Sequence, residues 1–415
     1  MSTITLPQLA WHGTKALELP LPAGWPVKFY DMAGGDRPAL KPDDIEASVR
    51  SPIGSPPIRE VARGKQQVVI IFDDMTRPTR VAEIAPFVLE ELSQAGIADS
   101  SIRFVCALGN HGALNRIDFV KKLGPETVAR CPVFNHNPFR NCIYAGTTGY
   151  GTKLYINSEV MKCDLKIAIG SVVPHPVTGF GGGGKIILPG VSSIETAEAF
   201  HRLPGRARRE KWTEQAIGMG AFENNPSRRD VEEAATIAGL DVKIDCLVNT
   251  RGETTAIYAG APKPAYDAAL EEAAAHYRTP KSQGETIIIA NTFAKANEAI
   301  LVGLGTAFAA IGPEGGDVVL IANAPDGQVT HYLMGWFGRT EGGAMGVRAR
   351  IPEHVRHVII YSEYLDLAGR RYVEESDKVQ FMGNWDDVVR VLQGFQVDKA
   401  RVAVYPAADI QYLSG

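Results

Sequence analysis

The chain has 415 residues, more than one ordinary hydrophobic core accommodates, which predicts two domains. Its composition, 45% hydrophobic and 22% charged, is that of a globular protein. The 43 basic and 47 acidic residues leave a net charge of -4, and the one basic run, residues 206–211, is typical of a solvated helix face. We therefore expect no nucleic-acid partner.

The five cysteines are an odd number without C-x-x-C spacing. This disfavours a disulfide framework or a structural zinc site and suits a reducing compartment. No apolar run approaches the length of a membrane span, and no cationic leader precedes an apolar core at the N-terminus. We expect a cytoplasmic protein with no membrane partner.

Short apolar runs alternate with helical patterns in the first part of the chain. Residues 67–72, 102–108 and 165–170 are predicted strands, and residues 80–96 have the apolar spacing of a helix that stops at a glycine. This alternation predicts an α/β domain with a largely parallel sheet.

A linker-like stretch, residues 278–284, interrupts the alternation, which then restarts. Three further strands are predicted beyond it: residues 285–290, 317–322 and 357–361. A last strand-like run, residues 401–405, could pair in either domain.

The expected architecture is therefore an α/β fold of two α/β domains with the active site in the cleft between them. The N-terminal domain, residues 1–278, would carry the loops of the site. The smaller C-terminal domain, residues 284–415, would have a last segment able to pack back on the first. Glycine and proline cluster in loops after strands, where open α/β sheets usually build their sites.

The most distinctive stretch is residues 174–190, which brings a histidine, four consecutive glycines and a lysine together. His175 lies between two prolines, which restrict the backbone and so orient the imidazole. Lys185 ends the glycine run, where the main chain can come close to a ligand. The P-loop pattern fails because Ile186 follows the lysine, which favours a close-approach loop with a reactive lysine. His201 follows on a predicted helix and could share this site.

Two earlier loops follow predicted strands. The sequence D-D-M-T-R-P at residues 73–78 contains Arg77, which could hold a carboxylate or phosphate through two parallel hydrogen bonds. The alternative is a capped turn with an internal Asp–Arg pair. His111 lies between Asn110 and Gly112, a context suited to proton transfer near neutral pH.

Lys295 follows the first strand of the second domain and could extend across the interdomain cleft, or it could be a solvated helix lysine. No H-E-x-x-H or H-x-H pattern occurs, so a zinc centre built from protein ligands alone is not expected. The remaining histidines are interpreted as bystanders: His12, His136, His276, His331, His354 and His357.

In combination, the motifs D-D-x-T-R-P, L-G-x-H, and P-H-x-x-x-G-F-x-G-G-x-K with I-x-P-G and a later histidine resemble the nickel-dependent lactate racemase family. They occur in the family's order, and the resemblance covers most of the chain. It implies a nickel pincer nucleotide cofactor, the nickel complex of pyridinium-3,5-bisthiocarboxylic acid mononucleotide. By position, Lys185 would be covalently linked to it and His201 would coordinate nickel. Further cofactor contacts are implied for Asp74, Thr76, Gly182, Gly183 and Gly184.

The resemblance also implies how the reaction is catalysed. His111 and His175 would be the acid/base pair, and Arg77, supported by Lys295, would bind the substrate carboxylate. The implied enzyme is an isomerase, a racemase or epimerase that inverts C2 of a 2-hydroxy acid. Because the carboxylate barely stabilises a C2 carbanion, the C2 hydride would move to the cofactor and back while a histidine holds the hydroxyl proton. Implied partners are the 2-hydroxy acid and the enzymes that make the cofactor and insert nickel.

Three departures from the family pattern affect the substrate side. Gly112 replaces a common arginine, and Gly183 and Gly184 make the loop richer in glycine than usual. Thr292 and Lys295 stand where a glutamine–lysine pair is common. We therefore expect a substrate other than lactate, such as an aldonate or an aromatic hydroxy acid, with lactate as second choice. The alternative is a non-catalytic two-domain protein that binds an anionic metabolite or nucleotide.

Overall fold

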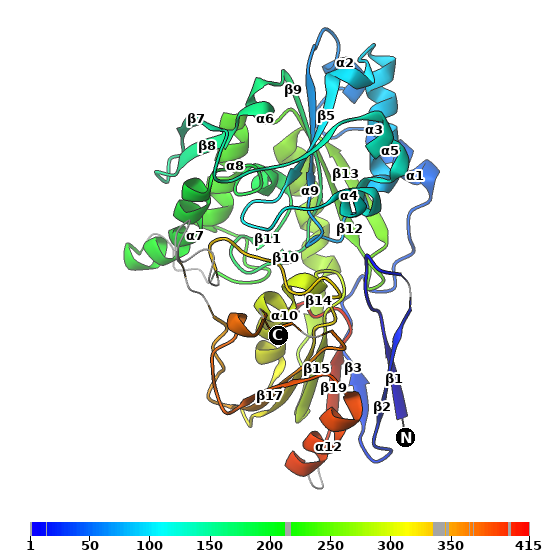
Figure 1. The fold of residues 1–415 in the computed structure, drawn as a ribbon, viewed down its shortest axis with the longest axis vertical. Helices are drawn as coiled ribbons and strands as arrows, with labels where there is room; N and C mark the ends of the chain where they lie inside the picture. The colour runs from blue at the N-terminus through cyan, green and yellow to red at the C-terminus, as the bar shows by residue number, and fades with distance from the viewer. Residues whose placement is uncertain are drawn as a thin grey trace.

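The computed structural model contains two six-stranded sheets whose carboxyl ends face each other (Figure 1). It describes residues 2–13, 15–211, 217–334, 345, 348–364, 366–367, 369–396 and 400–414. The α/β architecture predicted from the sequence is confirmed. Each predicted strand is present within about two residues of its expected bounds, and so is the predicted helix, α3 (Val81–Gln94).

The first sheet has the order β13-β12-β9-β4-β5-β6, and its pairs are parallel except β12 with β13. Its central strands are continuous apolar runs because helices and loops cover both faces. The strands are β4 (Val68–Asp73), β5 (Ile102–Ala107), β6 (Val133–Asn135), β9 (Leu165–Ser171), β12 (Val242–Val248) and β13 (Thr254–Gly260).

One face of the first sheet packs against α1, α3, α4, α5 and α9, and the other against α6, α7 and α8. In α3 the buried residues Val81, Ile84 and Val88 repeat at helical spacing, which directs one apolar stripe to the sheet. The remaining bounds are α1 (Pro42–Arg50), α2 (Ile58–Val61), α4 (Arg116–Leu123), α5 (Pro125–Arg130), α6 (Ser158–Lys162), α7 (Ile194–Arg209), α8 (Pro226–Ala238) and α9 (Pro262–His276).

The second sheet has the order β18-β17-β16-β15-β19-β3, and all its pairs are parallel. One face packs against α10 (Ala299–Ala310) and the other against α12 (Trp385–Phe395). The strands are β3 (Val27–Phe29), β15 (Ile287–Asn291), β16 (Gly316–Ile321), β17 (Val355–Tyr361), β18 (Val379–Met382) and β19 (Val402–Tyr405).

The two ends of the chain pack against elements that are distant from them in the sequence. The N-terminal hairpin, β1 (Ser2–Leu6) with β2 (Leu17–Leu21), contributes to the core of the second sheet, and β3 is its edge strand (Figure 1). A domain boundary at residue 278 therefore does not separate the two sheets. The second sheet includes β3 from the start of the chain, because strands pair by tertiary contact and not by their order in the sequence. At the other end, β20 (Tyr412–Ser414) pairs with β14 (Arg278–Pro280).

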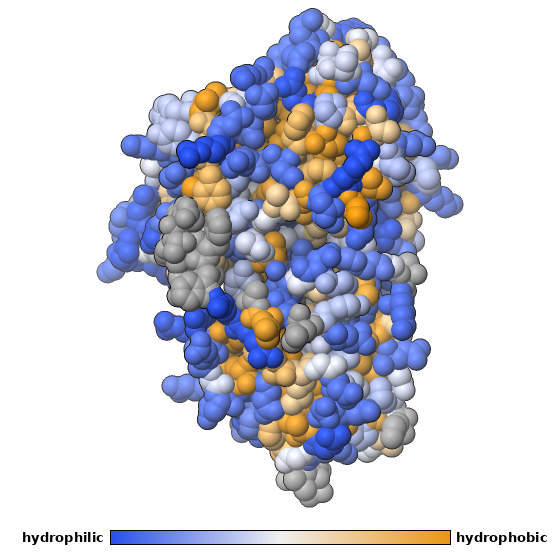
Figure 2. Space-filling model, viewed as in Figure 1, coloured by the Kyte–Doolittle hydropathy of each residue, from blue (hydrophilic) through white to orange (hydrophobic). Residues whose placement is uncertain are grey.

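Short elements complete the fold around the junction. They are the hairpin β7 (Cys142–Thr147) with β8 (Lys153–Asn157), the small pair β10 (Pro174–His175) with β11 (Gly179–Phe180), and the 3-10 turns η1 (Asp99–Ser101), η2 (Gly183–Ile186), η3 (Ala296–Glu298) and η4 (Gly369–Tyr372). Hydrophilic residues predominate around the outline of the face in Figure 2, and apolar residues show between them. Within the described residues, no helix combines the length and apolarity needed to cross a membrane.

Candidate active site

A cavity of about 540 Å³ lies where the two sheets face each other. Strands β4, β5 and β9 end beside it, as expected for a site at the carboxyl edge of a parallel sheet. Its wall includes every predicted site residue except Gly183 and Gly184. Segments between the strands of the second sheet, including Lys295 and Glu298, complete the wall, so both halves of the chain build the site.

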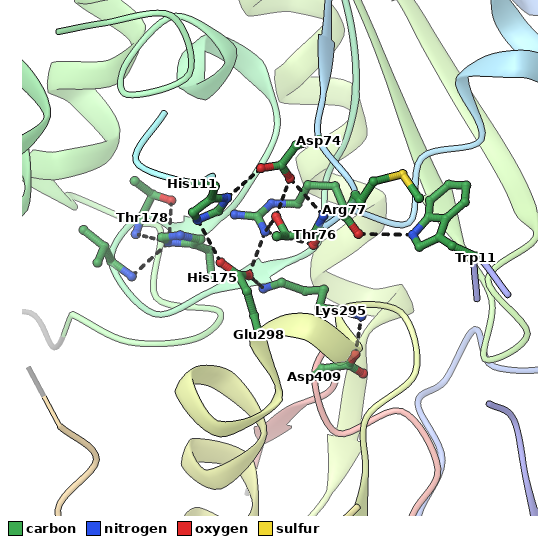
Figure 3. Close-up of polar contacts among 12 residues, drawn as sticks. Trp11, Asp74, Thr76, Arg77, His111, His175, Thr178, Lys295, Glu298 and Asp409 are labelled. Carbon is green, nitrogen blue, oxygen red and sulfur yellow. Dashed lines mark hydrogen bonds and ion pairs between the residues drawn. The ribbon is translucent and has the colours of Figure 1, made fainter. Parts of the chain in front are cut away.

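The loop after β4 holds Asp74, Thr76 and Arg77 in one cluster (Figure 3). The Thr76 backbone N–H donates to Asp74 Oδ1 at 2.9 Å, and Arg77 Nη1 donates to Thr76 Oγ1 at 2.7 Å. Lys122 of α4 fixes the loop from behind, because its buried ammonium donates to the carbonyls of Asp74 and Arg77 at 2.9 Å each. Local bonds therefore organise this loop before any ligand binds.

His111 is held between carboxylates from the two halves of the protein. Its Nδ1 lies 2.6 Å from Asp74 Oδ2, and its Nε2 lies 3.2 Å from Glu298 Oε1 (Figure 3). Burial alone lowers the pKa of His111, but Asp74 and Glu298 outweigh it and raise the pKa to about 9. His111 is therefore an imidazolium near neutral pH, with an N–H on each side.

Glu298 is a site residue that sequence reasoning missed. It ends η3, immediately before α10, and its Oε2 accepts a hydrogen bond from Arg77 Nη1 at 2.8 Å. Burial raises the pKa of Glu298, but Arg77 and Lys295 outweigh it and hold the pKa well below its usual range. The sequence showed an acid three residues after Lys295. It did not show that this side chain contacts Arg77 in the loop after β4 of the first sheet.

Lys295 lies in the cavity wall rather than on a solvated helix, so the alternative interpretation of Lys295 is wrong. It is 1% exposed, and its Nζ lies 3.5 Å from Glu298 Oε2 without a hydrogen-bond partner among the described residues. Burial and the nearby Arg77 lower its pKa to about 8. Asp409 anchors the segment by accepting the backbone N–H groups of Phe293, at 3.0 Å, and of Lys295.

The glycine loop is shaped by packing as well as by access to the cavity. Gly182 and Gly183 have φ of 74° and 55°, which disfavours other residues. A Cβ on Gly183 would lie 2.7 Å from the Tyr266 ring, and one on Gly184 would lie 2.4 Å from the Val231 carbonyl oxygen. The structure thus packs Gly183 and Gly184 against α9 and α8, where the sequence predicted cofactor contacts; only Gly182 lines the cavity.

Lys185 and His201 converge beside Phe200. Lys185 Nζ lies 5.7 Å from the Phe200 ring centroid, and the His201 ring centroid lies 5.1 Å from it. Burial, with Arg77 and Arg228 nearby, lowers the Lys185 pKa well below its usual value. Within the described residues, no hydrogen bond or ion pair engages the Lys185 amine. His201 Nδ1 donates to the Ala197 carbonyl at 2.7 Å, which leaves Nε2 as an acceptor on the cavity side.

His175 is in the opposite charge state to His111. Its Nδ1 accepts the backbone N–H groups of Val177 at 3.1 Å and Thr178 at 3.4 Å, so the ring proton lies on Nε2. Burial and the nearby Lys185 hold the pKa of His175 well below its usual value. The predicted acid/base pair therefore consists of one imidazolium and one neutral imidazole in the same cavity.

His331 also lines the cavity, which corrects its interpretation as a bystander. Its ring centroid lies 5.3 Å from that of His111 and 6.1 Å from that of His201. Backbone bonds across the junction place it there: Gly112 N–H donates to Thr330 O at 3.0 Å, and Tyr332 N–H to Asn110 O at 2.7 Å. Its local sequence carries no signal of this pairing.

Comparison with known proteins gives one consistent family. Residues 12–213 match the lactate racemase N-terminal domain family. The lactate racemase of Thermoanaerobacterium thermosaccharolyticum is 26% identical over 299 residues, 71% of this chain and 68% of that protein. The lactate racemase of Lactiplantibacillus plantarum is 28% identical over 289 residues, 69% of this chain and 66% of that protein.

Solved structures show the same fold over all or most of the chain. The lactate racemase apoprotein of Thermoanaerobacterium thermosaccharolyticum matches with a TM-score of 0.75 at 20% identity, covering 100% of both chains. A protein from Thermotoga maritima matches with a TM-score of 0.65 at 17% identity, covering 91% of this chain and 99% of that one. The family resemblance and the fold class inferred from the sequence are confirmed.

Proposed function

We propose that this chain, whose residues 12–213 belong to the lactate racemase family, is an isomerase that inverts C2 of a 2-hydroxy acid. The observation that carries the proposal is the pair of histidines in opposite charge states. His111 is cationic and His175 is neutral in one cavity, which Arg77 and Lys295 also line. Inversion requires polar groups that contact the substrate hydroxyl in each of its two orientations, which a single acid/base group does not provide.

The residues fit the family's cofactor, the nickel pincer nucleotide. Lys185, a partly buried amine with a lowered pKa and no hydrogen-bond or ion-pair partner among the described residues, is suited to covalent attachment, whereas a structural lysine would have a counter-charge beside it. His201 has a free Nε2 for nickel, and no group of three or more His, Cys, Asp or Glu side chains among the described residues forms a metal site. The remaining nickel ligands would then belong to the cofactor. When bound, the group supplies the acceptor and donor of the C2 hydride.

The protein's own part is to bind the substrate and to move one proton. Within the described residues, every hydrogen bond of the Arg77 guanidinium uses Nη1, so Nη2 remains for the substrate carboxylate, together with the Lys295 ammonium. His111 can give its Nε2 proton to the substrate oxygen without moving, because Nδ1–H stays on Asp74. In the reverse direction the same Nε2 would take that proton back from the substrate hydroxyl.

His175 would contact the substrate oxygen in its other orientation as a hydrogen-bond donor through Nε2–H, which the backbone contacts at Nδ1 keep in place. A non-catalytic anion-binding protein fits the cavity less well, because Glu298 already occupies one side of Arg77. We also propose that the protein works in the cytoplasm, where the enzymes that make the cofactor and insert nickel would load it.

Intact-mass measurement after co-expression with the cofactor-making enzymes tests the proposal. A mass adduct on Lys185 with stoichiometric nickel supports it, and Lys185→Ala is the control that should carry neither. An unmodified Lys185 under these conditions contradicts it. His201→Ala should keep the adduct but lose nickel, whereas replacing His111 or His175 should keep both and abolish turnover.

Isotope labelling tests the hydride path separately. Substrate deuterated at C2 should retain the label in the same molecule through repeated inversion. Loss of deuterium to solvent would rule out hydride transfer, because only a proton-abstraction path exchanges C2 with water.

A further inference from the structure

The cavity contains a carboxylate where the substrate must bind. Glu298 contacts Arg77 Nη1 at 2.8 Å and His111 Nε2 at 3.2 Å, and lies 3.5 Å from Lys295 Nζ. These are the three groups assigned above to the substrate carboxylate and hydroxyl. A bound 2-hydroxy acid therefore lies against Glu298.

The charge balance at this point limits the substrate to one negative charge. Arg77, Lys295 and His111 carry the positive charge, and Asp74 and Glu298 carry the negative charge. One substrate carboxylate completes the balance of these five groups. The cations that contact Glu298 are Arg77, Lys295 and His111, and the first carboxylate completes their balance. A second carboxylate beside Glu298 would therefore be repelled by it, although Arg208 also lines the cavity.

The substrate group next to Glu298 must be a hydrogen-bond donor. Glu298 is 7% exposed, so a bound substrate removes most of the water that remains beside it. A methyl group, as in lactate, would displace water from the carboxylate without replacing the hydrogen bonds of that water, which disfavours binding. A hydroxyl group would donate to the carboxylate and offset that loss.

His331 supplies the complementary donor. Its Nδ1 accepts the Leu333 backbone N–H at 3.3 Å, so the ring proton lies on Nε2. It flanks His111 from the second half of the chain, as Glu298 does, with its ring 5.3 Å from that of His111. A hydroxyl both donates and accepts, so it matches a carboxylate and an imidazole N–H presented together.

We infer that Glu298 and His331 together bind a hydroxyl group at C3, so that the preferred substrate is a 2,3-dihydroxy monocarboxylic acid. Aldonates belong to this class. The inference rests on the proposed function and narrows its substrate. The inferred site would favour this class over lactate, which lacks the C3 hydroxyl, and over 2-hydroxy dicarboxylic acids, which carry a second negative charge.

Glycerate and lactate form a matched pair for the test, because they differ only in the C3 hydroxyl. For the nickel-loaded enzyme we expect kcat/KM for inversion of glycerate to exceed that for lactate by about 100-fold or more. Malate should be inverted no faster than lactate. A ratio of glycerate to lactate near one, or a preference for malate, would overturn the inference.

Variants at the two residues identify the source of the preference. Glu298→Ala and His331→Phe should each lower the glycerate-to-lactate ratio at least roughly 10-fold. Glu298 also affects the charge of His111, but that effect acts on both substrates and cancels in the ratio. Glu314→Gln, which removes an exposed carboxylate outside the cavity, is the control and should leave the ratio unchanged. An unchanged ratio in Glu298→Ala would refute the role of Glu298.

The outcomes separate the inference from the function on which it rests. If the Lys185 adduct is present and kcat/KM for lactate or an aromatic hydroxy acid equals that for glycerate, only the inference fails. If the loaded enzyme inverts no 2-hydroxy acid, the proposed function fails and the inference falls with it. Calorimetric titration of the loaded enzyme with hydroxypyruvate and pyruvate adds a binding readout, with hydroxypyruvate expected to bind more tightly.

Discussion

Glu298 Oε1 lies 3.2 Å from Nε2 of His111, so a carboxylate beside the second sheet adds to the effect of Asp74 in raising the pKa of a histidine beside the first. The other ring nitrogen, Nδ1, lies 2.6 Å from Asp74 Oδ2. The acid/base chemistry of the site therefore depends on how the two halves of the chain are held together.

The first prediction concerns the titration of His111. Burial lowers its pKa, but Asp74 and Glu298 raise it to about 9, and His331, His201 and Arg77 are the other ionisable groups around it. NMR of the imidazole should show this value, and Glu298→Gln should lower it. Because the folded pKa exceeds the unfolded value of about 6.5, this interaction stabilises the fold fully below pH 6.5.

The same contribution is lost as the pH rises through about 9. Urea unfolding at pH 6 and at pH 9.5 should therefore show a larger stability difference in the natural protein than in Glu298→Gln, on the order of 1–3 kcal/mol. Equal differences in the two proteins would show that Glu298 does not hold the proton on His111.

The second prediction compares two lysines, Lys185, which is partly buried, and Lys243, which is fully buried. Lys185 has no hydrogen-bond or ion-pair partner among the described residues, whereas Lys243 Nζ lies 2.6 Å from Asp245 Oδ1 with both side chains fully buried. Lys185→Met should stabilise the cofactor-free protein by about 1 kcal/mol, because a partly buried amine without a partner among the described residues is replaced by an apolar group of similar size. Lys243→Met should destabilise it by about 3–5 kcal/mol, because Asp245 is left unpaired.

Thermal unfolding of the two variants measures both effects. Asp245 also accepts the Gly183 backbone N–H at 2.9 Å, so Lys243→Met should disturb the glycine loop as well. A loss of stability in Lys185→Met comparable with that in Lys243→Met would mean that Lys185 has a structural role.

The third prediction concerns the glycine loop. An added Cβ at position 184 would lie 2.4 Å from the Val231 carbonyl oxygen, a backbone atom that cannot move aside independently. Gly184→Ala should therefore destabilise the protein by about 2 kcal/mol or more. Gly205 in α7 has open space around an added Cβ, so Gly205→Ala should instead stabilise by about 0.5–1 kcal/mol. Guanidinium unfolding of the pair measures both, and a neutral Gly184→Ala would show that the loop packs less closely than this contact indicates.

The fourth prediction concerns Asp409, which positions Lys295 through two backbone N–H groups. Burial raises the pKa of Asp409 to about 6, so it is mostly ionised near neutral pH. Asp409→Ala leaves these donors unsatisfied and should cost about 1–3 kcal/mol of stability. It should also raise KM roughly 10-fold with a smaller effect on kcat, because in the proposed function Lys295 binds the substrate carboxylate and moves no proton.

Asp377→Ala, which removes an exposed carboxylate outside the cavity, is the matched control and should change neither value. Steady-state kinetics of the loaded enzyme decides the point. A fall in kcat with KM unchanged would assign Asp409 a different role, because it would then affect the chemical step and not substrate binding.

Much of the fold was predictable because its determinants are contiguous. Runs such as residues 67–72 are apolar throughout, as strands buried on both faces must be, and their alternation with helices indicates parallel sheets. The unusual loops were predictable for the same reason. Two prolines around His175 and a glycine run before Lys185 are local constraints on the backbone, and those loops do line the cavity.

Only the tertiary structure determined which groups meet. Neither Glu298 nor His331 lies in a distinctive local sequence, yet both flank His111 because the junction brings their segments to the loop after β5. Strand β3 joins the second sheet for the same kind of reason, by pairing with β19 across most of the chain length. The sequence alone determined the elements, the loops and the family, because each depends on neighbouring residues. The charge of His111 and the environment of the substrate arise from contacts between the two halves, which no local pattern encodes.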